Sequence, residues 1–168
     1  MRVCVNDMKS KTVIRITLGL IILLFQPLGH ADPVKVSVVK TAQGYQLLRG
    51  GEPYVVKGAG FSQGDMSSLA KFGGNSIRTW HVEEDREKGM ALLDQAQALG
   101  ITVSLCLNIA RERHGFDYND PELVQKQFEQ AKEAVQMYKD HPAVLSWIIG
   151  NELNYDYRNP RVYDAVND

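Results

Sequence analysis

Cysteine is scarce in this chain, and its scarcity excludes a fold held together by disulfides. The sequence has 168 residues and two cysteines. Cys4 lies in an N-terminal segment that we expect to be removed, which leaves Cys106 alone. A single cysteine within an apolar run cannot form an internal disulfide and is expected to be a small buried hydrophobic residue.

Other absences narrow the range of functions. The chain has no excess of positive charge: residues 32–168 contain 15 Lys/Arg against 19 Asp/Glu. A mildly acidic chain is a poor partner for nucleic acid or an anionic membrane surface. The G-x-S-x-G motif of nucleophilic hydrolases is also absent. His114, Asp117 and Asp120 match no zinc or EF-hand spacing, so we expect no metal ion and no cofactor.

The first 31 residues have the pattern of a secretory signal peptide. A basic stretch precedes the unbroken apolar run Ile16–Phe25, and Gly29 and Ala31 supply the small residues of a cleavage site. The apolar run is too short for a stable membrane-spanning helix. We therefore expect export to the periplasm or the extracellular space, without stable membrane insertion after cleavage; an uncleaved membrane anchor is the alternative.

Residues 32–53 form the next predicted unit, an N-terminal β-hairpin segment. Tyr45–Arg49 and Tyr54–Lys57 have strand character, and Gly50-Gly51 lies between them. Two consecutive glycines supply the positive φ angles that a tight hairpin turn requires.

From residue 54 to residue 168 the pattern alternates between strands and helices. Asp65 and Asp120 are placed to cap the first and third helices, and Pro121 suits a first helical turn. The predicted strands are Tyr54–Ala59, Asn75–Trp80, Ile101–Leu107 and Val144–Ile149, and the predicted helices are Asp65–Phe72, Glu87–Leu99 and a long helix that starts after Asp120 and ends at His141-Pro142.

Short apolar strands that alternate with helices predict an α/β fold with a parallel sheet and helices packed outside it. A doubly wound sheet and the first part of a (β/α)8 TIM barrel both fit. About four βα units are present, whereas a complete barrel needs roughly 250 residues. We therefore expect the N-terminal half of a TIM barrel, truncated after its fourth strand, with exposed half-barrel edges through which copies of the chain could self-associate.

Polar side chains follow the ends of successive predicted strands. A barrel would bring these ends together around one mouth, where such enzymes place their chemistry. The side chains in question are Arg78, Trp80, His81, Asn108, Asn151 and Glu152. Simpler roles stay open: a structural ion pair for Arg78, a surface loop for His81, and a surface charge for Glu152.

Glu152 has the clearest chemical potential among these residues. It follows the buried run Val144–Ile149 after Gly150, so we expect partial removal of its carboxylate from water. Such burial favours the protonated form, which a general acid working near neutrality needs. Asn151 can donate and accept hydrogen bonds and is placed to bind a substrate hydroxyl. The acidic run from Glu83 to Glu87 is expected to be the solvated start of a helix.

Three segments resemble the clan A glycoside hydrolases. Trp147–Glu152 resembles the fourth-strand motif of that clan, in which an Asn-Glu pair supplies the acid/base. Gly51–Gly58 and Gly74–His81 resemble the first and second barrel strands of family 2 glycosidases in particular. The resemblance covers most of the stretch from residue 51 to residue 152.

The resemblance implies a catalytic role for Glu152 as acid/base and a substrate-binding role for Asn151 at the sugar 2-hydroxyl. It places Arg78 near the nucleophile and has Trp80, His81 and Asn108 line the sugar subsite. The implied activity is hydrolysis of O-glycosidic bonds in β-linked oligo- or polysaccharides by a retaining two-carboxylate mechanism. The family's nucleophile is a second Glu after the seventh strand, which no residue of this chain matches.

Three other functions stay open. The first is a catalytically inactive, carbohydrate-binding barrel fragment, and the second is a glucan transglycosylase that uses the same residues. The third is a dinucleotide-binding fold, which the sequence disfavours: Gln63 occupies the third glycine position of the fingerprint, and Arg78 lies where an acidic residue is needed.

Overall fold

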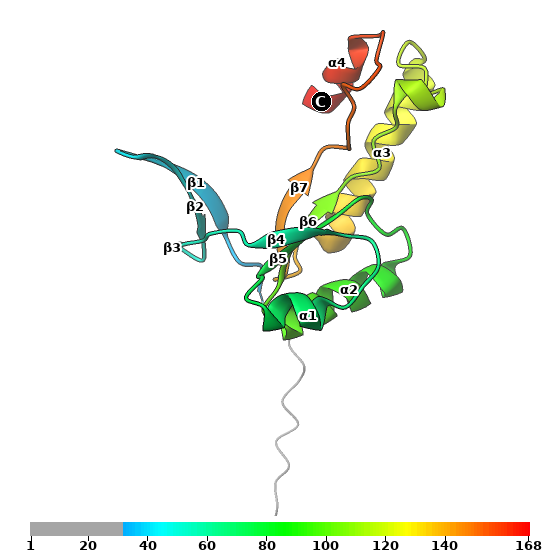
Figure 1. Cartoon of the computed structure of the whole chain (residues 1–168). Helices are drawn as coiled ribbons and strands as arrows, with labels where there is room; N and C mark the ends of the chain where they lie inside the picture. The colour runs from blue at the N-terminus through cyan, green and yellow to red at the C-terminus, as the bar shows by residue number, and fades with distance from the viewer. Residues whose placement is uncertain (1–31) are drawn as a thin grey trace, which may run out of the picture.

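The computed structural model describes residues 32–168. The predicted signal peptide, residues 1–31, lies outside the described residues. Two sheets organise the rest of the chain (Figure 1): a small N-terminal antiparallel sheet, and a parallel sheet with helices packed against it.

The N-terminal sheet contains β1 (Val36–Thr41), β2 (Gly44–Arg49) and β3 (Glu52–Pro53), in the order β1-β2-β3. Gly50 and Gly51 connect β2 and β3 with φ angles of 62° and 89°, so the predicted glycine turn is confirmed. The predicted return strand over residues 54–57 is wrong. A two-residue turn places Glu52 opposite Arg49, so the return strand starts earlier, at Glu52–Pro53, and is followed by one further backbone bond, from the Tyr54 N–H to the Leu47 carbonyl at 2.9 Å.

The parallel sheet contains β4 (Gly58–Phe61), β5 (Ser76–Thr79), β6 (Thr102–Cys106) and β7 (Val144–Ile148). Its spatial order is β4-β5-β6-β7, the same as the order in the sequence, and all three pairings are parallel. A doubly wound sheet reverses its strand order at a switch point, whereas a barrel adds its strands consecutively. The predicted half-barrel is therefore the observed arrangement, and β4 and β7 are the edges of this sheet.

The helices are α1 (Met66–Lys71), α2 (Arg86–Ala98), α3 (Pro121–Tyr138) and α4 (Arg161–Asn167), with a short 3-10 helix, η1, at Glu112–His114. Both predicted caps are confirmed. The Asp65 carboxylate accepts the backbone N–H of Ser67, and the Asp120 carboxylate accepts those of Glu122 and Leu123. No helix within residues 32–168 is long and apolar enough to cross a membrane.

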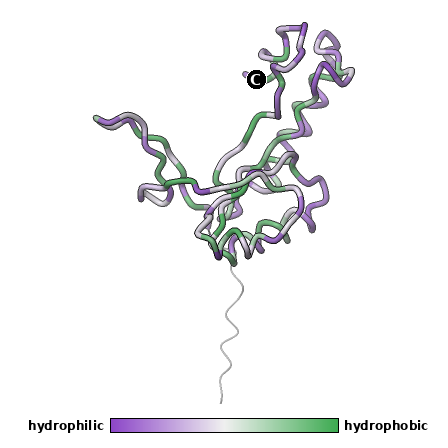
Figure 2. The backbone as a smooth tube through the Cα atoms, viewed as in Figure 1, coloured by the Kyte–Doolittle hydropathy of each residue, from purple (hydrophilic) through white to green (hydrophobic). Residues whose placement is uncertain are grey.

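The core lies between the parallel sheet and helices α2 and α3. Ile77, Val103 and Leu105 point from the sheet toward Leu93 of α2 and Tyr138 of α3, and all five are buried. Figure 2 shows hydrophobic residues along these strands and hydrophilic residues in loops and along parts of the helices. Alternation along the strands gives the opposite sheet face small polar residues, including Ser104 and Ser146, whose hydroxyls lie 2.9 Å apart.

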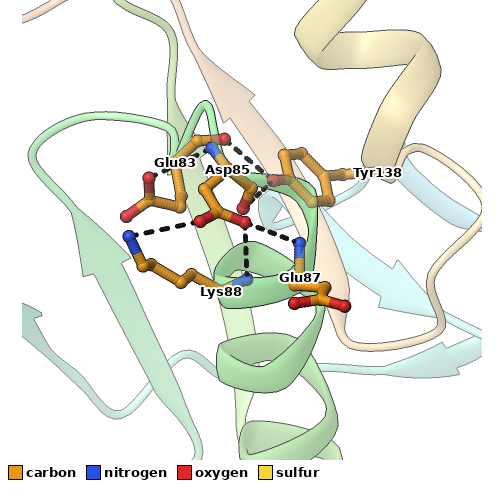
Figure 3. A network of polar contacts seen from close by, with 5 residues as sticks. All are labelled: Glu83, Asp85, Glu87, Lys88 and Tyr138. Atoms are coloured by element: carbon orange, nitrogen blue, oxygen red, sulfur yellow. Dashed lines mark hydrogen bonds and ion pairs between the residues drawn. The ribbon is translucent and has the colours of Figure 1, made fainter.

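Tyr138 anchors α3 to the start of α2 (Figure 3). Its hydroxyl donates to the carbonyl of Glu83 at 2.8 Å and to that of Asp85 at 3.3 Å. The Asp85 carboxylate caps α2 through the backbone N–H groups of Glu87 and Lys88 and pairs with the Lys88 ammonium. The hydrogen bonds from Lys88 lower the Asp85 pKa. The acidic run is thus a helix start, as predicted.

Candidate functional site

The parallel strands deliver the predicted site residues to one end of the half-barrel. An open cleft of about 540 Å³ lies there, and its lining includes four of them: Trp80, His81, Asn108 and Asn151. Trp80 and His81 follow β5, Asn108 follows β6, and Asn151 follows β7. Arg78 and Glu152 are not part of the lining but are bonded to it or adjacent to it.

Arg78 joins two of the cleft residues. Its Nη2 donates to Asn151 Oδ1 at 2.6 Å, and its guanidinium carbon lies 4.5 Å from the centroid of the Trp80 ring. Its Nε is buried and has no partner among residues 32–168. Arg78 therefore fixes the orientation of the Asn151 amide, with Oδ1 toward the guanidinium and Nδ2 free of that contact.

Trp80 has close contact with the strand beside it. A Cβ added to Gly60 of β4 would lie 2.7 Å from Trp80 Cζ2, so the indole can occupy this place only because residue 60 has no side chain. The Trp80 side chain is 45% exposed. An exposed aromatic face beside polar groups is suited to stacking against an amphipathic ligand such as a sugar ring.

Asn108 lines the cleft but also has a structural role. Its Oδ1 accepts the backbone N–H of Val82 at 3.0 Å, and its Nδ2 donates to the Val82 carbonyl at 3.2 Å. Both ends of the amide therefore hold the segment that follows β5. This engagement leaves Asn108 less capacity to bind a ligand than the sequence alone implies.

The surroundings of Glu152 differ from the prediction. Its carboxylate is 64% exposed, so the expected partial removal from water is wrong. The reason lies in the backbone: Gly150 and Glu152 have φ angles of 71° and 53°, which turn the chain sharply after β7. At the surface the carboxylate pairs with Arg113, whose Nη2 lies 3.0 Å from Glu152 Oε2.

A left-handed φ at a residue other than glycine costs of order 1–3 kcal/mol and is concentrated at functional sites. Glu152 and Asp156 both have this conformation, in the same loop. Within residues 32–168 these are the two residues other than glycine with a positive φ, so this form of backbone strain is confined to the segment after β7.

Sequence reasoning missed the residues that hold this segment in place. Arg111 donates through Nε to the carbonyl of Asn151 at 2.8 Å. The Glu112 carboxylate accepts the backbone N–H groups of Arg158 at 2.6 Å and Asn159 at 2.8 Å, and these bonds lower the Glu112 pKa. The available signal was three consecutive charged residues, Arg-Glu-Arg, in a loop that follows a strand end.

Two exposed tyrosines follow Glu152. The Tyr155 ring lies 4.9 Å from the Arg113 guanidinium, and the Tyr157 ring meets Tyr163 of α4 edge-to-face at 5.2 Å. Tyr157 thus has a packing partner, while Tyr155 belongs to the surroundings of the Arg113–Glu152 pair.

Most of the charged side chains described above bind backbone atoms or form ion pairs with one another. Within residues 32–168, no three His, Cys, Asp or Glu side chains lie together in a way that could hold a metal ion. The groups that line or adjoin the cleft are the Glu152 carboxylate, amides, guanidinium groups, the Trp80 indole and the imidazoles of His81 and His114.

A half-barrel of consecutive parallel strands with polar groups at their carboxyl ends defines the class: this is a TIM-barrel type of α/β protein. The comparison with known families makes the assignment specific. Residues 56–168, about two thirds of the chain, match the family described as "Glycosyl hydrolases family 2, TIM barrel domain". The chain belongs to this family and is a glycoside hydrolase-like protein, which confirms the resemblance found in the sequence.

Proposed function

We propose that the chain acts on the O-glycosidic bonds of β-linked carbohydrates by a retaining two-carboxylate mechanism, with Glu152 as acid/base. The observation that carries the proposal is the pair Asn151-Glu152 at the end of β7. Asn151 is bonded to Arg78 there and lines the same cleft as Trp80 and His81.

Each side chain has a definite task in this proposal. Because Asn151 Oδ1 accepts from Arg78, its Nδ2 is left to donate to a sugar hydroxyl beside the reacting carbon. Trp80 offers its exposed face to the sugar ring. Glu152 gives its proton to the leaving glycosidic oxygen, and in the second step it takes a proton from the attacking water.

The proposal leaves the nucleophile to a carboxylate outside this chain. A retaining mechanism needs two carboxyl groups about 5–5.5 Å apart. The carboxylates near α2 are used elsewhere: Asp85 caps the helix, and Glu83 accepts the backbone N–H of Asp85. We also propose that the protein acts after export, which rests on the composition of residues 1–31.

A small anion added to the solution can take the place of a missing nucleophile, and this provides the test. Azide attacks the anomeric carbon, the bond from that carbon to the leaving oxygen breaks, and Glu152 donates its proton to that oxygen. The product is an α-glycosyl azide. Two substrates separate azide attack from proton donation. Departure of phenol from a phenyl β-glycoside needs the proton from Glu152, whereas departure of 2,4-dinitrophenolate does not.

We expect azide-dependent turnover of both substrates by the chain. Glu152→Gln should lower turnover of the phenyl glycoside at least 100-fold, the contribution typical of general acid catalysis, and leave the dinitrophenyl glycoside little affected. Glu122 is an exposed carboxylate in the first turn of α3. Glu122→Gln is therefore the matched control, and it should not change the turnover of either substrate. Equal effects of Glu152→Gln on the two substrates would remove Glu152 from the acid/base role.

A second candidate function is binding of carbohydrate without catalysis. The exposed Glu152 carboxylate, which is paired with Arg113 and not directed into the cleft, favours it. In that case the chain binds β-linked sugars but produces no glycosyl azide. Transfer to a sugar acceptor in place of water would use the same residues and would appear as a longer oligosaccharide product.

A further inference from the structure

We propose that Arg113 is a positioning residue that holds the Glu152 carboxylate outside the cleft in the absence of ligand and releases it when a sugar binds. This inference rests on the proposed function, because it concerns the state of the acid/base that the reaction would use. Arg113 belongs to η1, in the loop after β6, and not to the strand end that carries Glu152.

The two terminal nitrogens of Arg113 have different partners. Nη1 donates to the backbone carbonyl of Glu152 at 2.6 Å and to that of Tyr155 at 3.1 Å. Nη2 pairs with the Glu152 carboxylate at 3.0 Å. One nitrogen therefore holds the loop, and the other holds the side chain that the loop carries.

The exposure of the two partners shows which one can move. The Arg113 side chain is 14% exposed, whereas that of Glu152 is 64% exposed. Arg113 is fixed by two backbone carbonyls and by the Tyr155 ring over its guanidinium. The carboxylate can rotate away from Nη2 while both bonds from Nη1 remain, so the loop keeps its shape during the change.

The ion pair between Arg113 and Glu152 is weak enough for the carboxylate to be released. Ion pairs with an exposed partner contribute little, because water screens the charges. Contacts made by a bound sugar are sufficient to displace such a pair. The neighbouring charged groups do not replace Arg113: Arg111 is bonded to the Asn151 carbonyl, and Glu112 holds the backbone of Arg158 and Asn159.

The test follows the Glu152 side-chain carboxyl carbon by NMR in the 168-residue chain and in three variants. Arg113→Gln removes the charge, and Arg113→Lys keeps it. Lys132→Gln breaks a comparable exposed pair with Glu129, 3.4 Å apart on α3, and is the matched control. Hydrogen exchange of the backbone amides in residues 151–156 reports the state of the loop in each protein.

We expect Arg113→Gln to move the Glu152 carboxyl resonance, because the carboxylate loses its partner at Nη2. Arg113→Lys should restore much of this change. Both variants should speed amide exchange in the loop several-fold, because a lysine cannot replace the two bonds from Nη1. Lys132→Gln should change neither reading. An unchanged Glu152 carboxyl resonance in Arg113→Gln overturns the proposal.

Addition of a β-linked disaccharide completes the test. In the wild-type chain the Glu152 carboxyl resonance should move toward its position in ligand-free Arg113→Gln while the loop amides keep their protection. Sugar binding that leaves this resonance in place overturns release by Arg113 and leaves the proposed function standing. Absence of sugar binding defeats the proposed function, and the release of Glu152 fails with it. A moved Glu152 resonance in ligand-free Arg113→Gln still identifies the ion pair.

Discussion

Two glycines of β4 give opposite predictions, although they are two residues apart on one strand. A methyl group added at Gly60 would meet the side chain of Trp80, with 2.7 Å to Cζ2. A methyl group added at Gly58 would meet the backbone of Ser76, with 2.7 Å to the carbonyl oxygen. The indole is half exposed and can shift, whereas the carbonyl is fixed in the adjacent paired strand.

The magnitudes follow from these neighbours. Gly60→Ala loses the stacking of Arg78 on Trp80, worth about 0.5–1 kcal/mol, and gains about 0.4–1 kcal/mol because alanine restricts the unfolded chain. The free energy of unfolding should therefore change by less than about 1 kcal/mol. Gly58→Ala forces a rigid backbone to move, and overpacking of this kind costs about 1–3 kcal/mol.

Urea denaturation and the indole N–H resonance of Trp80 provide the measurements. Gly58→Ala should lower the free energy of unfolding by about 2 kcal/mol and leave the Trp80 resonance close to its wild-type position. Gly60→Ala should do the reverse: it should displace the resonance, weaken sugar binding and keep the protein stable. Equal destabilisation by both variants, or an unmoved Trp80 resonance in Gly60→Ala, refutes the placement of Trp80 over β4.

Three further predictions concern the elements that support the site. The methyl group of Gly89→Ala would overlap the Tyr138 hydroxyl. Alanine is the better helix former by about 1 kcal/mol, but the overlap should outweigh this gain. We expect urea denaturation to show a net loss of about 1–2 kcal/mol in the free energy of unfolding. Asp120→Ala removes the cap of α3 and should cost about 1 kcal/mol, measured in the same way. The Glu112 pKa lies below its ordinary value of 4.5, so its contribution is present above that pH and is lost as the pH falls through the lowered value. The protection factors of the Arg158 and Asn159 amides, corrected for the intrinsic exchange rate at each pH, should fall over that acidic range, and Glu112→Gln should abolish this change in protection.

The sequence was sufficient to predict the features that depend on local chemistry. Asp65 and Asp120 cap helices because short acidic side chains satisfy free N–H groups at a helix start. The glycine pair at residues 50 and 51 turns the chain because both φ angles are positive. Consecutive parallel strands then follow from short apolar runs separated by helices, and this order brings the polar strand ends to one cleft.

The start of β4 could not be predicted from local pattern. Val55 and Val56 have strand propensity but are exposed, while Gly58 to Gly60 have little propensity and form the strand. The pairing with Ser76–Thr79 decides the outcome, and this pairing is a contact between distant parts of the chain.

The environment of Glu152 was unpredictable for a related reason. An apolar run before a carboxylate indicates burial only when the backbone continues in the same direction. The positive φ angles at Gly150 and Glu152 and the ion pair with Arg113, 39 residues away in sequence, decide its exposure. Such contacts between two loops leave no periodic signal in the sequence.

The central claim is that the strand ends form a carbohydrate site in which Asn151 meets the sugar. Its most direct test is the dissociation constant for a β-linked disaccharide, measured by calorimetry for the wild-type chain, Asn151→Ala and Asn154→Ala. Asn154 is an exposed residue of the same loop and serves as the control. We expect Asn151→Ala to weaken binding by about tenfold, which corresponds to one lost hydrogen bond, and Asn154→Ala to have no effect. Equal affinities of the wild-type and Asn151→Ala chains, or no binding to the wild-type chain, would contradict the account.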